Sequence, residues 1–86
     1  MDNDALRNLA LNPVTDLPDP AERVRLRNKF GISQGTLAAT MGVARRTIYS
    51  WEHGISEPHG SKRVMYAKVL ALWQRREREV TPDGER

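Results

Sequence analysis

The sequence predicts a small all-α domain, and three observations lead to that prediction. Leucine, alanine and arginine are abundant while aromatic and β-branched residues are sparse, which favours helices over strands. Apolar residues recur at helical spacing in segments separated by glycine or proline. The 86-residue chain has no cysteine, so its modest core holds together without disulfides or thiolate metal sites, or borrows surface from a second subunit.

The first 18 residues predict a short helix followed by a linker. In residues 2–11, Leu6 and Leu9, with Leu11 beside them, stand on one side of a helix. A helix of this length is marginal by itself in water, so it needs a surface on which to dock. Two prolines disfavour helix in residues 12–18, which therefore read as a linker.

The next helix is expected to run to about Phe30. Asp19 can cap it, Pro20 suits the first helical position, and Glu22 stands at the capping-box position. Gly31 is expected to end it as a C′ glycine. Its buried stripe would be Leu26 and Phe30 with Val24 or Ala21, and its solvated side chains would be Arg23, Arg25 and Lys29.

Arg27 differs from these cations because its spacing from Leu26 and Phe30 places it near the core-facing edge of the same helix. Two interpretations follow. Arg27 is either one more surface charge or a partner for Glu52, which lies further along the chain.

Residues 33–54 predict two short helices joined by a tight turn. Ser33 can cap the first helix, and Gly42 supplies the positive φ needed at the break. The second helix, expected over residues 44–53, buries Ile48 and Trp51. A basic and polar outer face on the second of two such helices is typical of the helix-turn-helix arrangement; here that face carries Arg45, Arg46, Thr47, Tyr49 and Ser50.

After a loop containing Pro58, a long helix is expected from Gly60 or Ser61 to about Glu79. It carries an apolar arc wider than that of an ordinary surface helix, so one stripe can cover the helix pair and the other needs a partner subunit or the N-terminal helix. The two stripes are Tyr66, Leu70, Trp73 and Met65, Val69, Leu72. Residues 81–86 read as a frayed tail.

The charge is concentrated in the middle of the chain. The formal net charge is +3, but residues 19–63 hold eight basic and four acidic side chains, net +4, which suits a polyanionic partner. No apolar run approaches the ~20 residues of a membrane span, and no basic start leads into an apolar stretch. These features predict a soluble cytoplasmic chain.

The segment GISQGTLAATMGVARRTIYSWEHGISEP resembles the phage-repressor/Cro-type helix-turn-helix proteins, also called the xenobiotic-response-element family. The resemblance covers about residues 19–72. Its matching features are Gly31-Ile32-Ser33-Gln34, Leu37-Ala38, Gly42-Val43, Ile48, Trp51-Glu52, Gly54 and Pro58.

The resemblance implies a compact four- to five-helix, lambda-repressor-like domain over residues 19–73, flanked by residues 1–18 and 74–86. It also implies a homodimer on an inverted-repeat operator of double-stranded DNA, with the helix 44–53 in the major groove. Such a protein would be a transcriptional repressor. Ala44 departs from the family pattern because it stands where a serine or threonine often caps the second helix.

The expected site residues fall into four groups; the resemblance implies most of them, whereas Lys62 and Arg63 are added for their charge and the dimer interface for its apolar stripe. Base contacts are expected from Arg45, Arg46, Tyr49 and Ser50, and backbone contacts from Gln34, Thr47, His53, Lys62 and Arg63. Arg27 and Glu52 match a pair that often forms a buried ion pair. The dimer interface is expected at Tyr66, Leu70 and Trp73.

Alternatives remain open for these residues and for the function. The two arginines can be a solvated basic face, and Tyr49 can be structural. His53 and His59 lack further ligands at metal-binding spacing, so no metal or other cofactor is expected. No nucleophile–His–carboxylate set or Gly-rich phosphate loop indicates an enzyme. The alternative function is a protein-interaction module, an antitoxin or anti-activator, that holds a partner on the last helix.

Overall fold

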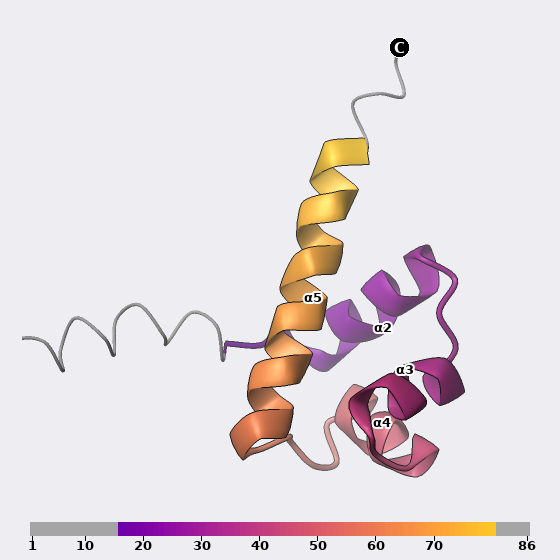
Figure 1. The fold of residues 1–86 in the computed structure, drawn as a ribbon, viewed down its shortest axis with the longest axis vertical. Coiled ribbons are helices and arrows are strands. Elements are labelled where there is room, and N and C mark those ends of the chain that lie inside the picture. The colour runs from indigo at the N-terminus through magenta and orange to yellow at the C-terminus, as the bar shows by residue number, and fades with distance from the viewer. Residues whose placement is uncertain (1–15, 81–86) are drawn as a thin grey trace, which may run out of the picture.

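The computed structural model describes residues 16–80, which form four helices and no strand. The helices are α2 (Pro20–Lys29), α3 (Gln34–Met41), α4 (Arg45–Glu52) and α5 (Gly60–Val80). Figure 1 shows α5 as a long upright helix, with α2 crossing beside its middle and the α3–α4 pair packed near its beginning. The predicted all-α, lambda-repressor-like class is confirmed. The expected helix over residues 2–11 and the tail over 81–86 lie outside the described residues.

The start of α2 follows the predicted cap with one difference. The Oδ1 atom of Asp19 accepts a hydrogen bond from the Glu22 backbone N–H at 2.9 Å, and Pro20 occupies the first turn. The Glu22 carboxylate, expected at a capping-box position, instead binds the Arg25 guanidinium at 2.7 and 2.8 Å. A guanidinium one turn away offers two charge-assisted bonds, which outcompete a single backbone N–H.

The two ends of α3 are capped in different ways. Ser33 Oγ accepts from the Thr36 backbone N–H at 3.0 Å, as expected for an N-cap. Gly42 ends the helix with a φ of +72°. A residue with a side chain would be strained in this backbone conformation. Lys62 then reaches back from α5 and donates to the Met41 carbonyl at 2.7 Å. These contacts fix where α4 can begin.

The start of α4 lacks a side-chain cap, as the sequence predicts from Ala44. Its backbone is already in the extended N-cap conformation, with φ −75° and ψ 152°. We therefore expect Ala44→Ser to raise the free energy of unfolding by about 1 kcal/mol, since a hydroxyl there can accept from the Thr47 N–H. Urea denaturation measures this gain. Ala39→Ser, at an exposed position inside α3, is the matched control and should bring no gain; equal effects would contradict the cap.

One core joins the helix pair to α2 and to one stripe of α5. Leu17, Ile32, Val43, Val69 and Trp73 pack around its edge. On α5, Tyr66 and Leu70 are buried in this core, and Val69 and Trp73 pack at its edge, whereas Met65 and Leu72 are exposed. Within the described residues, the buried members are Leu26, Leu37, Ala38, Met41, Ile48, Trp51, Tyr66 and Leu70.

Two of the expected dimer-interface residues belong to this core. Tyr66 is 0% exposed and Leu70 is 1% exposed, so a second subunit cannot reach either side chain, and that prediction is wrong for both. Their stripe is the one that covers the helix pair. Trp73, the third residue, is half-buried and stacks on Phe30 of α2, with ring centroids 6.3 Å apart.

Tyr66 carries a buried hydroxyl that has no hydrogen-bond partner among residues 16–80. Burial raises the pKa of this phenol to about 12, since its anion would lose solvation in the core. The folded pKa thus lies above the ordinary value of 10.0. The contribution of the neutral Tyr66 phenol to the free energy of unfolding is therefore fully present below pH 10. It is lost as the pH rises through the pKa of Tyr66 in the folded protein.

We therefore expect the chain to lose about 2–3 kcal/mol of stability between about pH 10 and pH 12 through Tyr66 alone. The measurement is urea denaturation across this range for the parent and for Tyr66→Phe. Since the hydroxyl has no partner in the described chain, the phenylalanine variant should be no less stable at neutral pH and should lack this part of the alkaline loss. Identical alkaline profiles would contradict the role of Tyr66.

The far half of α5 is held to α2 by charged side chains. Arg25 donates to both Glu77 oxygens, at 2.8 and 3.0 Å, while it also binds Glu22. The Arg25 guanidinium lowers the pKa of the Glu77 carboxyl. Arg25, expected to be solvated, is exposed but paired. No helix within residues 16–80 combines the length and apolar character needed to cross a membrane.

Candidate nucleic-acid interface

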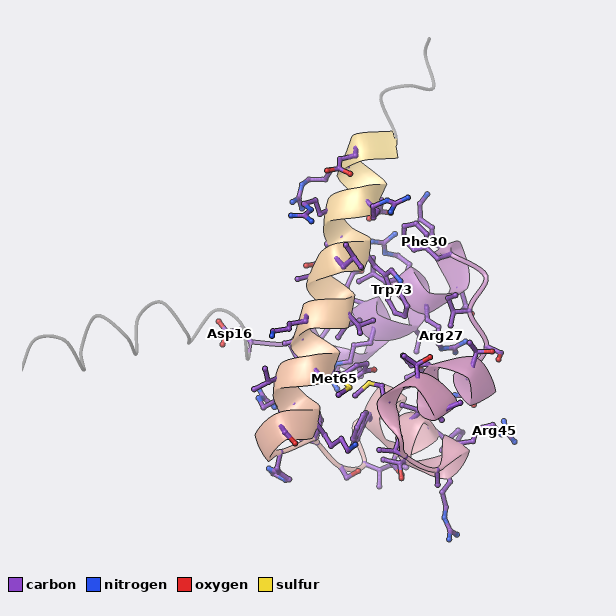
Figure 2. The ribbon with its side chains drawn as sticks, viewed as in Figure 1. Asp16, Arg27, Phe30, Arg45, Met65 and Trp73 are labelled. Atoms are coloured by element: carbon purple, nitrogen blue, oxygen red, sulfur yellow. The ribbon has the colours of Figure 1, made fainter. Side chains whose placement is uncertain are left out.

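The outer surface of the helix pair begins with two arginines. Arg45 and Arg46 are the first two residues of α4, and both are exposed. Figure 2 shows Arg45 at the edge of the molecule, on the side of the helix pair away from α5. Neither the core nor α5 limits access to this first turn of α4. Its guanidinium groups can therefore meet a ligand without unfolding any described helix.

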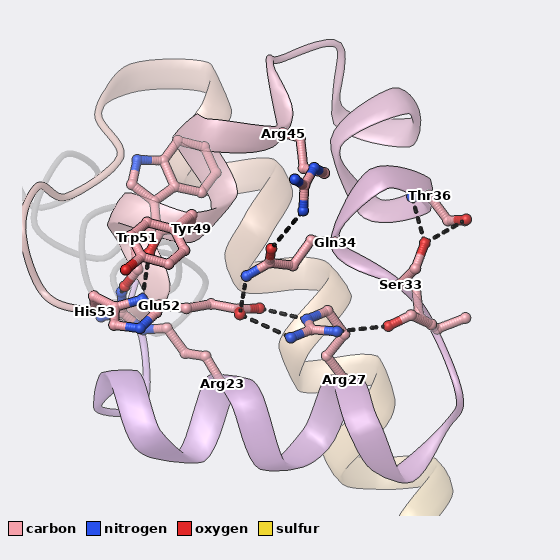
Figure 3. A network of polar contacts seen from close by, with 11 residues as sticks. Arg23, Arg27, Ser33, Gln34, Thr36, Arg45, Tyr49, Trp51, Glu52 and His53 are labelled. Carbon is pink, nitrogen blue, oxygen red and sulfur yellow. Dashed lines mark hydrogen bonds and ion pairs between the residues drawn. The ribbon is translucent and has the colours of Figure 1, made fainter.

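A chain of hydrogen bonds connects Arg45 to the protein interior (Figure 3). Arg45 Nη1 donates to Gln34 Oε1 at 3.4 Å, and Gln34 Nε2 donates to Glu52 Oε1 at 3.0 Å. Glu52 accepts two bonds from Arg27, at 2.5 and 2.9 Å. The first residue of α3 thus bridges the first and last residues of α4. A buried carboxylate fixes the bridge, and the bridge orients the exposed arginine.

The Arg27–Glu52 pair is the anchor of this chain. The Glu52 side chain is 1% exposed and that of Arg27 is 11% exposed, so both charges are largely removed from water. The hydrogen bonds to Glu52 raise the pKa of Arg27. Arg27 also donates to the Ile32 carbonyl at 2.8 Å. One guanidinium therefore ties α2 to α4 and to the loop that precedes α3.

The other polar residues near the arginines of α4 differ in how exposed they are. Thr47 and Ser50 are half-buried. Tyr49 is exposed and stacks on His53, with ring centroids 3.9 Å apart. His53 Nδ1 lies 2.9 Å from the Tyr49 carbonyl, which can only accept, so the bonded tautomer carries its proton on Nδ1. In that tautomer the other ring nitrogen, Nε2, carries a lone pair and can accept a hydrogen bond from a donor outside the helix.

Lys62 and Arg63, expected to contact a phosphate backbone, both make contacts within the chain. Lys62 caps α3 through the Met41 carbonyl. Arg63 Nη1 lies 3.5 Å from the Pro58 carbonyl and 3.9 Å from Glu57. The structure therefore gives each of them a structural contact at the start of α5, separate from the α4 arginines.

Arg23 is buried behind α4 and supports the end of that helix. Arg23 was expected from the sequence to be solvated, and that prediction is wrong. It is 4% exposed and donates to the Pro18 carbonyl at 2.7 Å and to the Trp51 carbonyl at 3.0 Å. It also binds Glu57 at 3.1 Å. These bonds hold the end of α4 and the following loop against α2. Arg23 precedes Leu26 by three residues and Arg27 by four, and this spacing placed it on the buried side.

The loop residue Glu57 is consequently a structural partner of Arg23. Its carboxylate is turned toward the interior cation, which reduces the acidic character of the surface beside α4. No group of three or more histidine, cysteine or carboxylate side chains is arranged as a metal site in the part of the chain that the structure describes.

Comparison with known proteins gives two matches. The model of the Cro/C1-type helix-turn-helix family matches residues 25–71, more than half of the chain. A curated protein named antitoxin HigA-2, from Vibrio cholerae serotype O1, is 36% identical over 56 residues. That alignment covers 64% of this chain and 54% of the relative, so the match spans about half of the relative's length. No solved structure matches the chain significantly.

Proposed function

Since the chain belongs to the Cro/C1-type helix-turn-helix family of DNA-binding regulators, we propose that it is a sequence-specific repressor. In this proposal a homodimer binds an inverted-repeat operator in double-stranded DNA and occludes a promoter. The N-terminal half of α4 enters the major groove, and α3 lies across the phosphate backbone. A dimer contacts both half-sites from one side of the duplex. Their centres would therefore lie one helical turn, roughly 34 Å, apart.

The observation that carries the proposal is the pair of exposed arginines on the first turn of α4. Arginine presents a planar fork of donors that matches O6 and N7 of guanine. Arg45 makes a long 3.4 Å contact with Gln34, and Gln34 bonds to buried Glu52, so one conformation of the Arg45 side chain is favoured before DNA arrives. An oriented side chain loses less conformational entropy on binding, which favours base recognition over a diffuse basic surface.

The other polar side chains of α4 supply the remaining contacts in this proposal. Ser50 and Tyr49 would meet base edges or a thymine methyl, and Thr47 and His53 would meet the phosphate backbone. Gln34 would contact phosphate from the first turn of α3, where backbone N–H groups also favour an anion.

The experiment that tests this function is selection of bound duplexes from a random DNA pool, with the enriched sites aligned. We expect an inverted repeat with guanine in each half-site. A variant carrying both Arg45→Ala and Arg46→Ala is the control and should lose the guanine positions. A folded parent protein that enriches no sequence would contradict the proposal.

The second candidate function is that of an antitoxin, in which the chain holds a protein partner on α5. The name of the Vibrio cholerae relative favours it, and so does the exposure of Met65 and Leu72 on that helix. The two functions are compatible, because one chain can present α4 to DNA and α5 to a protein. A pulldown with the parent chain and with the Leu72→Glu variant as bait tests this candidate. A stable complex that Leu72→Glu abolishes is expected, and the absence of any complex would contradict it.

A further inference from the structure

The side of α5 that faces away from the core carries exposed apolar residues with cations among them and beyond them. We call this surface the outer face of α5. Met65 is 39% exposed and Leu72 is 45% exposed, although both lie on a helix whose other side is fully buried. The following residues line a shallow groove on this face: Lys68, Ala71, Leu72, Arg75 and Arg78.

The charge of the outer face disfavours its pairing with a second copy of itself. Lys68, Arg75 and Arg78 are exposed cations, and Glu79 lies 3.9 Å from Arg75 at the end of the face. Two copies packed face to face would bring six of these cations together with two carboxylates. Like charges placed opposite one another oppose association, so the face suits a helix that carries leucine and an acidic group.

Residues 2–11 of the same chain have this chemistry. In a helix, Asp2, Leu6 and Leu9 follow the spacing i, i+4, i+7 and share one side, whereas Arg7 lies about 100° away from Leu6. The complementary side thus carries leucine at its centre and a carboxylate at one end. A helix this short needs a surface on which to dock.

The described part of the chain begins at Asp16, just before α2. Leu17 packs against the core to which α5 contributes Tyr66 and Leu70. In the view of Figure 2, Asp16 is on one side of α5, and Phe30 and Trp73 are on the other. Residues 12–15 are sufficient to turn the chain back along α5.

We propose that residues 2–11 form an amphipathic helix that docks antiparallel on the outer face of α5 in the same molecule. Leu9 then lies at Leu72, and Asp2 reaches Arg75 and Arg78. The lengths agree, because Asp2 to Leu9 spans about 10 Å of helix and Leu72 to Arg78 about 9 Å, at about 1.5 Å per residue. Docking covers the exposed leucine and places the carboxylate among the cations, so a protein partner that uses Leu72 would have to displace residues 2–11.

The absence of native cysteine makes disulfide trapping a direct test in the full chain. Ala10→Cys with Ala71→Cys places one thiol on each proposed surface without removing a leucine. Ala10→Cys with Ala39→Cys is the matched control, because Ala39 is exposed on α3. After mild oxidation of dilute protein, we expect the first pair to form an intrachain disulfide at least about tenfold faster than the control, as the effective concentration rises on docking. Adding Leu6→Asp and Leu9→Asp should abolish this difference.

Two results would overturn the proposal. A disulfide found only between two chains would assign the outer face to the N-terminal segment of a second copy. If no disulfide forms, the Leu72 methyl resonances decide, with buried Leu37 as the internal reference. The Leu6→Asp/Leu9→Asp change should shift the Leu72 methyls and leave those of Leu37 in place; unchanged Leu72 methyls would refute docking.

Discussion

Replacement of Glu52 by alanine is expected to lower the free energy of unfolding by about 3–5 kcal/mol. Its carboxylate is 1% exposed and accepts two bonds from Arg27 and one from Gln34. Without it, the Arg27 guanidinium remains in the interior without a countercharge, and the Gln34 amide loses its acceptor. Urea denaturation of parent and variant at neutral pH measures the loss.

Two controls make this result interpretable. Glu79→Ala removes an exposed carboxylate 3.9 Å from Arg75 and should cost about 0–1 kcal/mol. A double variant, Arg27→Met with Glu52→Leu, should be less destabilised than Glu52→Ala, because it leaves no unpaired charge behind. If Glu52→Ala were as mild as Glu79→Ala, the buried pair would not be the anchor of the fold.

Arg45→Ala and Arg46→Ala are each expected to weaken binding to the selected operator by about 1–3 kcal/mol, roughly 5- to 150-fold in Kd. Both side chains are exposed, so the free energy of unfolding should stay within about 0.5 kcal/mol of the parent. Fluorescence anisotropy with labelled operator measures the affinity. Arg76→Ala, which removes an exposed arginine from α5, is the matched control and should change it little.

The same titrations distinguish base recognition from contact with phosphate. Loss of a guanine contact reduces affinity for the operator more than for random DNA of the same length. Equal losses on both duplexes would make the altered arginine a phosphate contact and contradict its assigned role. The salt dependence of binding provides a second reading, since losing one phosphate contact lowers the slope by about 1.

Much of the fold was predictable because local chemistry and tertiary packing agree in this chain. Asp19 and Ser33 cap the helices that they were expected to cap. Gly42 adopts the left-handed conformation at the predicted turn, and Ala44 leaves α4 without a side-chain cap. Each of these features depends on neighbours within a few residues, so the sequence alone contains the information.

Features that depend on residues far apart in the sequence were harder to predict. Arg23 looked like a surface cation, but its partners are the Trp51 carbonyl and Glu57, far along the chain. Tyr66 belongs to one of two apolar stripes on α5, and periodicity could not tell which stripe the core would take. Lys62 was assigned to phosphate because of its charge, and the structure uses that charge at the end of α3.

The candidate site was predictable to a similar extent. The resemblance placed Arg45 and Arg46 on the outer side of the second helix, and both are exposed there. It also paired Arg27 with Glu52, which form an ion pair. The resemblance also implies that Gln34 supports the second helix, but its two partners, Arg45 and Glu52, depend on how α3 packs against both ends of α4.

The measurement that tests the central claim most directly is the ratio of two dissociation constants at physiological salt. One is for the selected operator, and the other is for a duplex of the same length and composition with shuffled sequence. A repressor that reads bases through α4 should bind the operator at least about 10³-fold more tightly, and the Arg45→Ala/Arg46→Ala double variant should lose most of that preference. A ratio near one for the folded parent would contradict the account.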